Sequence, residues 1–388
     1  MKLKEVVNKQ LEKEFLQFPV QLYKNEKNWI RPLDKDIEFV FNRNKNKFFK
    51  NGDAIRWLLK NEKDQTIGRI AAFYHKKTSN QSEQPTGGVG FFECINNQQA
   101  ANMLFDAAKN WLQEKGFEAM DGPINFGDRN EWWGLLVNGF HEPNYSMHYN
   151  FPYYKTLFEN YGFRKYFEQY TYHTKIKNPN LHPDLIKRAE QIGQDKDYVF
   201  KHIQKKNLDQ HAEEFRHVYN KAWAKFSDVG KMTKYQAKAI LKRLKPIMDE
   251  RLIWLGYYND TPIAVFIMIP DMNQIFKYLN GKIHTWAKIK LLLIKTFMKQ
   301  TKAIGLIFGV SPEFQGKGVD GAMIKAFADF AQKSSFQYED LEMNWIGDFN
   351  PKMIRVVEKV GARIKKVHVT YRYLFDRSAP FHRAPIIQ

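Results

Sequence analysis

Residues 304–331, which read IGLIFGVSPEFQGKGVDGAMIKAFADFA, decide the fold. The segment from Ile304 to Val310 is almost entirely apolar and predicts a buried strand. From Val319 onward, apolar residues recur every three to four positions, which predicts a helix with one buried face. Between them, Gln315 to Gly318 combine two glycines with a lysine, so the backbone can turn tightly beside a helix N-terminus. Free N–H groups at a helix start attract anions. The stretch therefore predicts a strand, an anion-binding loop and a helix.

Two known phosphate-binding patterns fit this loop poorly. A P-loop requires Gly-x-x-x-x-Gly-Lys-Ser/Thr, which the loop lacks. The glycines at 316, 318 and 321 match the letters of the dinucleotide fingerprint Gly-x-Gly-x-x-Gly. That fingerprint begins directly after its strand, whereas the segment from Ser311 to Gln315 intervenes here. A dinucleotide site is therefore disfavoured, and a plain strand–helix connection remains the alternative to an anion site.

The loop resembles the acyl-CoA loop of the GNAT superfamily of N-acyltransferases, whose core is Gln/Arg-x-x-Gly-x-Gly/Ala. Gln315 and Gly318 fit this core, whereas Asp320 replaces its last small residue. A helix of this family beside the coenzyme is matched by Asn350 to Gly361. The resemblance implies that strand backbone groups hold the pantetheine arm and that loop amides hold the pyrophosphate. It assigns to acyl-CoA the residues Phe308, Val310, Gln315, Gly316, Lys317, Gly318, Val319 and Asn350.

Two segments of the chain repeat each other. The residues Glu159, Gly162, Arg164 and Thr171-Tyr172 recur at the same spacing as Glu358, Gly361, Arg363 and Thr370-Tyr371. Each set belongs to a predicted helix, glycine and strand, and each is preceded by a predicted hairpin, strand, helix and strand. We therefore expect an α/β (α+β) chain of two tandem GNAT-like domains, each a mixed, mainly antiparallel sheet flanked by helices.

The expected domains are residues 1–178 and 179–388. In the first, Asn96 to Gln99 occupy the place of the acyl-CoA loop and lack its motif, so this half resembles a degenerate copy. Acyl-CoA is accordingly expected only in the second half. The sequence also predicts a basic helix over residues 286–300.

The composition indicates a soluble protein with a basic surface. No apolar run is long enough to span a membrane, and the N-terminus lacks the apolar core of a signal peptide. With Cys94 as the single cysteine, we expect a cytoplasmic protein without an internal disulfide. The net charge of +19 suits anionic partners such as CoA, nucleic acid or a membrane surface. Because the lysines are spread along the chain, a nucleic-acid face is disfavoured.

The long irregular stretch from Asp121 to Pro152 is a second candidate functional segment. Loops of this length are usually functional or disordered, and its many aromatic residues argue against disorder. We expect its polar side chains to orient an acceptor and a tryptophan to cover it. The candidates are Asp128, Arg129, Glu131 and Trp132. The alternative is that the loop only braces the two halves.

The chemistry implied by the resemblance is transfer of an acyl group to an amine. Acetyl-CoA or another acyl-CoA would be the co-substrate, and Glu342 on the strand after the central helix is the candidate general base. The tyrosine acid common in this family is replaced by Val357, and the 11 histidines show no metal-ligand spacing. We expect an N-acyltransferase, and specifically an N-acetyltransferase, whose acceptor is an unidentified small-molecule or peptide amine. The alternatives are a non-catalytic CoA-binding module and a basic nucleic-acid or membrane-surface binder, and no oligomeric state is indicated.

Overall fold

The computed structural model describes residues 1–79, 84–177, 180–223, 231–283, 294, 298–333 and 335–387. The basic helix predicted over 286–300 lies largely outside these residues, and so does the predicted domain boundary at 178 and 179.

The first half of the chain contributes seven strands, of which five were expected in this order and two short ones are additions. Its elements are β1 (Lys2–Glu5), α1 (Lys9–Leu22), α2 (Asp34–Val40), η1 (Lys47–Lys50), β2 (Gly52–Lys60), β3 (Thr66–His75), α3 (Lys76–Ser79), β4 (Thr86–Cys94), α4 (Gln98–Glu114), β5 (Ala119–Gly122), β6 (Leu135–Asn138), α5 (Tyr154–Tyr161) and β7 (Arg164–Lys175). The added strands are β1 and β6. Strand β4 begins at Thr86, and Thr86 to Gly88 pair in parallel with β5.

The second half repeats this order. Its elements are α6 (Pro183–Gly193), β8 (Tyr198–His202), η2 (Lys205–Asn207), α7 (Leu208–Ala222), α8 (Lys234–Leu244), η3 (Glu250–Leu252), β9 (Ile253–Tyr258), β10 (Thr261–Pro270), α9 (Asn273–Phe276), β11 (Lys302–Val310), η4 (Pro312–Phe314), α11 (Val319–Ala331), β12 (Asp340–Gly347), α12 (Pro351–Lys359) and β13 (Arg363–Leu374).

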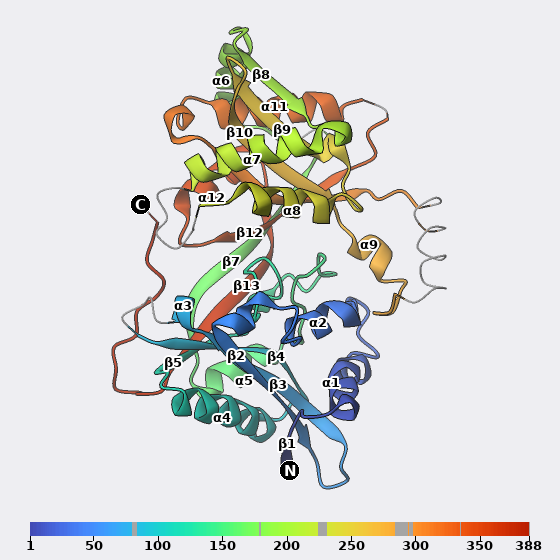
Figure 1. Cartoon of the computed structure of the whole chain (residues 1–388), viewed down its shortest axis with the longest axis vertical. Coiled ribbons are helices and arrows are strands. Elements are labelled where there is room, and N and C mark those ends of the chain that lie inside the picture. The colour runs from blue at the N-terminus through green and yellow to red at the C-terminus, as the bar shows by residue number, and fades with distance from the viewer. Residues whose placement is uncertain are drawn as a thin grey trace.

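The strands form one continuous sheet of mixed, mainly antiparallel pairing. Its order is β1-β2-β3-β4-β5-β13-β7-β12-β11-β10-β9-β8, with β6 pairing β13 beside this path. Read inward from either end, the order is the same for the two halves. In Figure 1 the halves lie above and below a waist that is crossed by β7 and β13. The predicted mixed α/β fold, with helices flanking a mainly antiparallel sheet, is confirmed.

The two halves exchange their last strands. Strand β13 of the second half pairs with β5 of the first, and β7 of the first half pairs with β12 of the second. The exchanged strands also pair with each other, antiparallel, from Arg363–His173 to Arg372–Arg164. The halves thus share one sheet, and the division at 178 stays a prediction drawn from the repeat.

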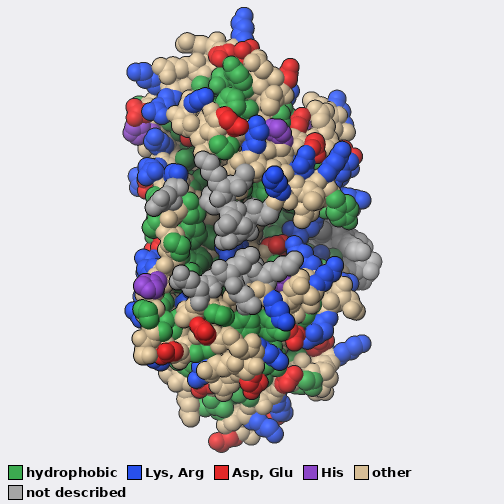
Figure 2. Space-filling model, turned by 60° about the vertical axis from the view of Figure 1, so that its left-hand side comes forward, with side chains coloured by type: hydrophobic (Ala, Val, Ile, Leu, Met, Phe, Trp, Pro, Cys, Tyr) green, Lys and Arg blue, Asp and Glu red, His purple; other side chains and the backbone are tan. Residues whose placement is uncertain are grey.

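Helices cover both faces of each half. In the first half α4 and α5 pack on one face and α1 and α2 on the other. In the second half α6, α11 and α12 share one apolar core with the sheet, and α7 and α8 form another across it. Burying a large apolar side chain contributes about 1.5–3 kcal/mol, so these four cores fix the helices against the sheet. On the face shown in Figure 2, lysine and arginine side chains are scattered over both ends rather than gathered into one patch.

Candidate active site

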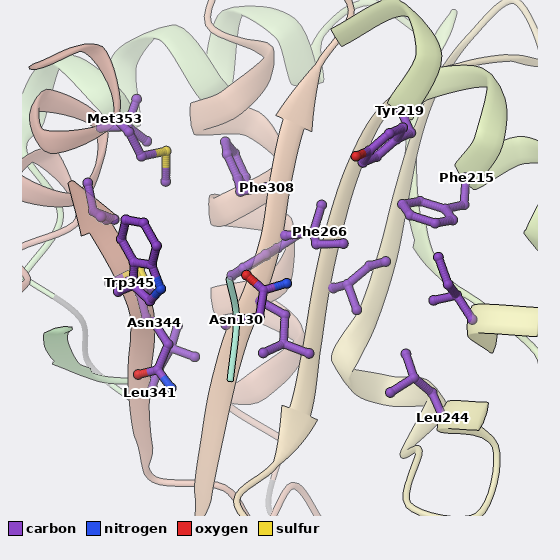
Figure 3. A pocket seen from close by; sticks show the side chains of 18 of the residues that line it. Asn130, Phe215, Tyr219, Leu244, Phe266, Phe308, Leu341, Asn344, Trp345 and Met353 are labelled. Carbon is purple, nitrogen blue, oxygen red and sulfur yellow. The ribbon is translucent and has the colours of Figure 1, made fainter. Parts of the chain in front are cut away.

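The sheet opens where β11 and β12 stop pairing. These two parallel strands, described along their whole length, pair from Lys302–Asp340 to Gly305–Met343 and not beyond. Figure 3 shows them running apart, with Phe308 on one side and Trp345 on the other. The register of β11 with β10 also shifts next to Leu306, a β-bulge that leaves this residue without a partner. Backbone edges of both strands therefore face the opening without a strand partner.

A cavity of about 850 Å³ occupies this opening. Its walls come from α7 and α8 on one face of the sheet and from α11 and α12 on the other. The volume lies in the upper part of the range for small-molecule sites, roughly 300–1,000 Å³. Most of the labelled lining in Figure 3 is apolar or aromatic, namely Phe215, Tyr219, Leu244, Phe266, Phe308, Leu341, Trp345 and Met353. Such walls suit an extended ligand with a hydrocarbon part.

The predicted anion-binding loop follows β11 at its carboxyl end. Gly318 is the N-cap of α11 with a φ of +89°, a conformation that favours glycine. No side chain caps this helix, so its first N–H groups point into the loop. The Gln315 side chain donates from Nε2 to the Val310 carbonyl at 2.8 Å, which ties the loop to the strand. Arg188 of α6 lies close to this glycine: a Cβ added at Gly318 would be 3.0 Å from the Cβ of Arg188.

The structure brings only part of the predicted acyl-CoA set to the cavity. Phe308 and Asn350 line it, whereas Gln315 to Val319 lie outside its lining. Val310 is 7% exposed and belongs to the core around α11. The cavity and the loop are therefore two neighbouring parts of one candidate site, joined by the length of β11.

The equivalent opening in the first half is closed. Strands β4 and β5 pair from Thr86–Ala119 to Gly88–Asp121. Beyond that point the Ile124 N–H donates to the Val89 carbonyl at 2.8 Å, so the next residues stay together. A Cβ on Gly90 would lie 1.9 Å from the Ile124 carbonyl oxygen, which only glycine avoids. The parting of strands seen between β11 and β12 is therefore not repeated between β4 and β5.

Part of the first-half loop reaches the cavity of the second half. Asp128, Arg129 and Asn130 line it, and Asn130 lies in front of the opening in Figure 3. The Arg129 carbonyl accepts a hydrogen bond from Trp345 Nε1 of β12 at 3.1 Å. Asp128 forms an exposed ion pair with Lys47 at 3.7 Å. The two halves therefore build the cavity together.

Glu131 follows these residues and carries an altered carboxyl group. Burial raises the pKa of Glu131, and the nearby Arg243 guanidinium only partly offsets this effect. Arg243, at the end of α8, lines the cavity. A carboxylate with a raised pKa is a stronger base than an ordinary one. Glu131 itself lies outside the cavity lining and is next in the chain to Asn130, which lines it.

No model of a known protein family matches the sequence. Two curated proteins are similar to nearly the whole chain. The bacterial ceramide synthase of Caulobacter vibrioides is 27% identical over 368 residues, which cover 92% of this chain and 94% of that protein. Protein YghO of Escherichia coli is 27% identical over 377 residues, which cover 94% of this chain and 93% of that protein.

Solved structures are similar to nearly the whole chain. A tandem GNAT protein from the clavulanic acid biosynthesis pathway superposes with a TM-score of 0.54 at 9% identity, covering 97% of this chain and 99% of that one. The chain has the tandem GNAT fold. The GCN5-related glucosamine N-acetyltransferase region of a fungal β-N-acetylglucosaminidase gives a TM-score of 0.55 at 11% identity, covering 96% of this chain and 38% of that longer one. At these identities the likeness concerns the fold alone.

In this tandem GNAT fold, Trp132 does not fit its expected role of covering an acceptor. Its side chain is 8% exposed and packs in the first-half core beside Phe91. It borders a separate cavity of about 50 Å³, and the backbone N–H of Trp132 donates to the Ser146 carbonyl at 2.7 Å. Trp132 therefore anchors the loop, which is the bracing role that the sequence left open.

The environment of Glu342 argues against its expected role as the general base. The side chain is fully buried and lies outside the cavity lining. Its carboxylate accepts hydrogen bonds from Lys365 at 2.6 Å and from Lys366 at 2.7 Å. Despite burial, these and Lys302 hold the pKa of Glu342 far below its usual range. A carboxylate held in this way is a weak base, and it serves instead as the counter-charge of three buried or half-buried lysines.

Sequence reasoning missed three polar residues of this region. Asn344 and Arg243 line the cavity, and Asn144 of the first-half loop contacts Asn344. Strand alternation was a usable signal, because it places Asn344 on the same face of β12 as Glu342. Nothing local indicated Asn144 or Arg243. Within the described ranges, no group of three His, Cys, Asp or Glu residues is arranged to hold a metal ion, and no helix has the length and apolarity to cross a bilayer.

Proposed function

We propose that this protein is an acyl-CoA-dependent N-acyltransferase. The observation that carries the proposal is the parting of β11 and β12 beyond Gly305–Met343, with a cavity in the opening and a helix N-terminus at its outer end. Unpaired strand edges accept an extended amide-containing arm, and the helix N-terminus with Lys317 accepts phosphate.

The dimensions support this placement. From Val310 to the last paired residue, Gly305, β11 spans five residues, or roughly 17 Å at about 3.3 Å per residue. A phosphopantetheine arm laid along this edge from the loop would bring its thioester to the bottom of the opening. The acyl group would then continue into the apolar part of the cavity.

The acceptor in this proposal is a primary amine that enters beside the first-half loop. Acyl transfer requires a neutral amine, and Glu131 is our candidate to remove its proton, in place of Glu342. Asp128, Arg129 and Asn130 line the same side of the cavity and would orient polar groups of the acceptor.

We further propose that at least one substrate carries a long hydrocarbon chain. The apolar walls from α7, α8 and α12 exceed what an acetyl group would contact. The similar Caulobacter protein is named a ceramide synthase, and a ceramide is the amide of a long-chain amine. Long-chain acyl-CoA with a long-chain amino alcohol is therefore the first pair to test.

The test combines binding and turnover. Calorimetry with CoA and acyl-CoA measures binding, and thiol release with mass spectrometry of the product measures transfer from acetyl-, octanoyl- and palmitoyl-CoA to a panel of amines. We expect binding at one site and amide formation that is faster with a long chain. Binding without any amide would support a non-catalytic CoA-binding module instead, and lack of binding would exclude both.

A further inference from the structure

Asn344 stands at the bottom of the opening between β11 and β12. It directly follows Met343, the last residue of β12 that pairs with β11. Its side chain lines the cavity, and Figure 3 shows it beside Trp345 at the edge of the opening. An amide here is close to the place where an arm laid along β11 would end.

The orientation of the neighbouring amide, Asn144, is fixed by charges. Its Oδ1 accepts hydrogen bonds from Lys302 at 2.9 Å and Lys366 at 3.4 Å, and ammonium groups can only donate. Its Nδ2 donates to Glu342 Oε2 at 2.8 Å, and a carboxylate can only accept. If the oxygen and nitrogen of Asn144 were exchanged, its NH₂ group would face the ammonium donors of the two lysines and its oxygen would face the carboxylate of Glu342.

This orientation fixes that of Asn344 in turn. Asn144 Nδ2 also donates to Asn344 Oδ1 at 2.9 Å, so the oxygen of Asn344 is turned toward Asn144. The Asn344 Nδ2 group has no hydrogen-bond partner among the described residues. Its two N–H bonds remain for a ligand. The positively charged lysines polarise the amide of Asn144, which in turn polarises the amide of Asn344 and makes its N–H groups stronger donors.

We propose that Asn344 is a catalytic residue that donates from Nδ2 to the carbonyl oxygen of the reacting thioester, and that Asn144 is the positioning residue that holds it. The inference rests on the proposed function. It gives the first half a share in the chemistry, because Asn144 belongs to the first-half loop. Donors aimed at an oxygen on which negative charge develops are among the largest contributors to catalysis.

The neutral amine nitrogen forms a bond to the thioester carbonyl carbon, and the carbonyl electron pair moves onto the oxygen held by Asn344. When this pair returns, the carbon–sulfur bond breaks and CoA leaves as a thiolate. The nitrogen gives up one proton and the thiolate takes up one, so an amide and free CoA result.

The experiment compares four variants with the wild type in acyl-CoA turnover, with thermal unfolding measured for each. Asn344→Ala removes the donor, and Asn344→Asp keeps the size and the contact with Asn144 but has no N–H to donate. Asn144→Ala releases the amide of Asn344, and Asn144→Ala/Asn344→Ala completes a double-mutant cycle. Asn138→Ala, at an exposed position on β6, is the control.

We expect both Asn344 variants to lower kcat by about 100- to 1,000-fold, with the Kd for acyl-CoA changed by less than about twofold. Asn144→Ala should lower kcat by roughly tenfold, and the double variant should be no slower than Asn344→Ala, because Asn144 acts through Asn344. Unchanged kcat in Asn344→Asp, or additive effects of the two alanine substitutions, would overturn the inference alone. A wild type that binds no acyl-CoA and makes no amide would overturn the proposed function with it.

Discussion

Glu131 is the residue whose charge state bears most directly on the proposed chemistry. Burial raises the pKa of its carboxyl, so a larger share is protonated in mildly acidic solution than for a free glutamate. A base works only when it is deprotonated. The rate should therefore fall on the acidic side over a pH range above about 4.3, the ordinary pKa of glutamate.

We predict that Glu131→Gln lowers kcat by about 100- to 10,000-fold and removes this acidic decline. The measurement is a pH profile of kcat and kcat/KM for both proteins. Glu142→Gln is the matched control, since Glu142 lies in the same loop and pairs only with Lys277 at 3.2 Å among its described ion-pair partners. A normal rate in Glu131→Gln would exclude Glu131 as the base and would leave the loop only a role in binding the acceptor.

Two buried histidines make the fold sensitive to acid. Burial lowers the pKa of His148 to about 3 and that of His368 to about 4. In the unfolded chain both take up a proton near pH 6.5. Stability is therefore complete above about pH 6.5 and declines as the pH falls toward about 4, because only the unfolded chain binds the protons.

We predict that His368→Gln makes this decline shallower by one proton. Glutamine can still donate to the His148 carbonyl, which accepts from His368 Nε2 at 3.1 Å. Because folded His368 stays unprotonated where the unfolded chain binds a proton, it lowers the free energy of unfolding by roughly 3 kcal/mol between pH 7 and pH 4. Urea unfolding at a series of pH values measures it, with the exposed His382→Gln as control. Equal slopes for wild type and His368→Gln would contradict the assignment.

At the scale of elements, the loop before α11 should decide coenzyme affinity. Lys317 and the uncapped N-terminus of α11 present positive charge at the carboxyl end of β11. Lys333 follows the other end of the same helix. Each lysine lies over a different phenylalanine ring: Lys317 Nζ is 5.5 Å from the ring centroid of Phe314, and Lys333 Nζ is 4.5 Å from that of Phe330.

We predict that Lys317→Glu weakens CoA binding by about 10- to 100-fold, the loss of a charge-assisted hydrogen bond and its replacement by repulsion. Lys333→Glu makes the same change in net charge and should bind CoA normally. Calorimetry on both variants makes the comparison. Similar losses in the two would indicate only a general electrostatic effect of the basic surface.

The elements themselves were largely predictable, whereas their pairing was not. The apolar run of 304–310 and the helical spacing after Val319 became β11 and α11. The exchange of β7 and β13 leaves no local trace, because both strands carry the same motif and either suits either place. The positions of Phe308 in the strand and of Gly318 at the start of the helix could be predicted from the sequence, whereas their binding of acyl-CoA stays a prediction. The surroundings of Glu342 could not be predicted, because they depend on three lysines that the fold brings from β11 and β13.

For the whole molecule, strand exchange makes each half dependent on the other. Without β13, β5 would lose its antiparallel neighbour, and without β7, β12 would lose its own. We predict that residues 1–178 and 179–388 expressed separately do not reach the native fold and that co-expression restores a complex. Circular dichroism and size-exclusion chromatography measure this. A separate half that has native-like secondary structure and unfolds cooperatively would contradict this prediction. It would show that the last strand of a half can pair within its own half.

The central pair of strands also limits how the molecule can move. Many two-lobed proteins admit ligands by hinge bending, in which the lobes swing apart as rigid bodies. Here β7 and β13, each 12 residues long, lie side by side at the waist and belong to both lobes. A swing would have to shear their shared ladder of hydrogen bonds. Substrates must therefore enter and products leave through local rearrangement of loops, and the pace of those loops will bound the rate of turnover.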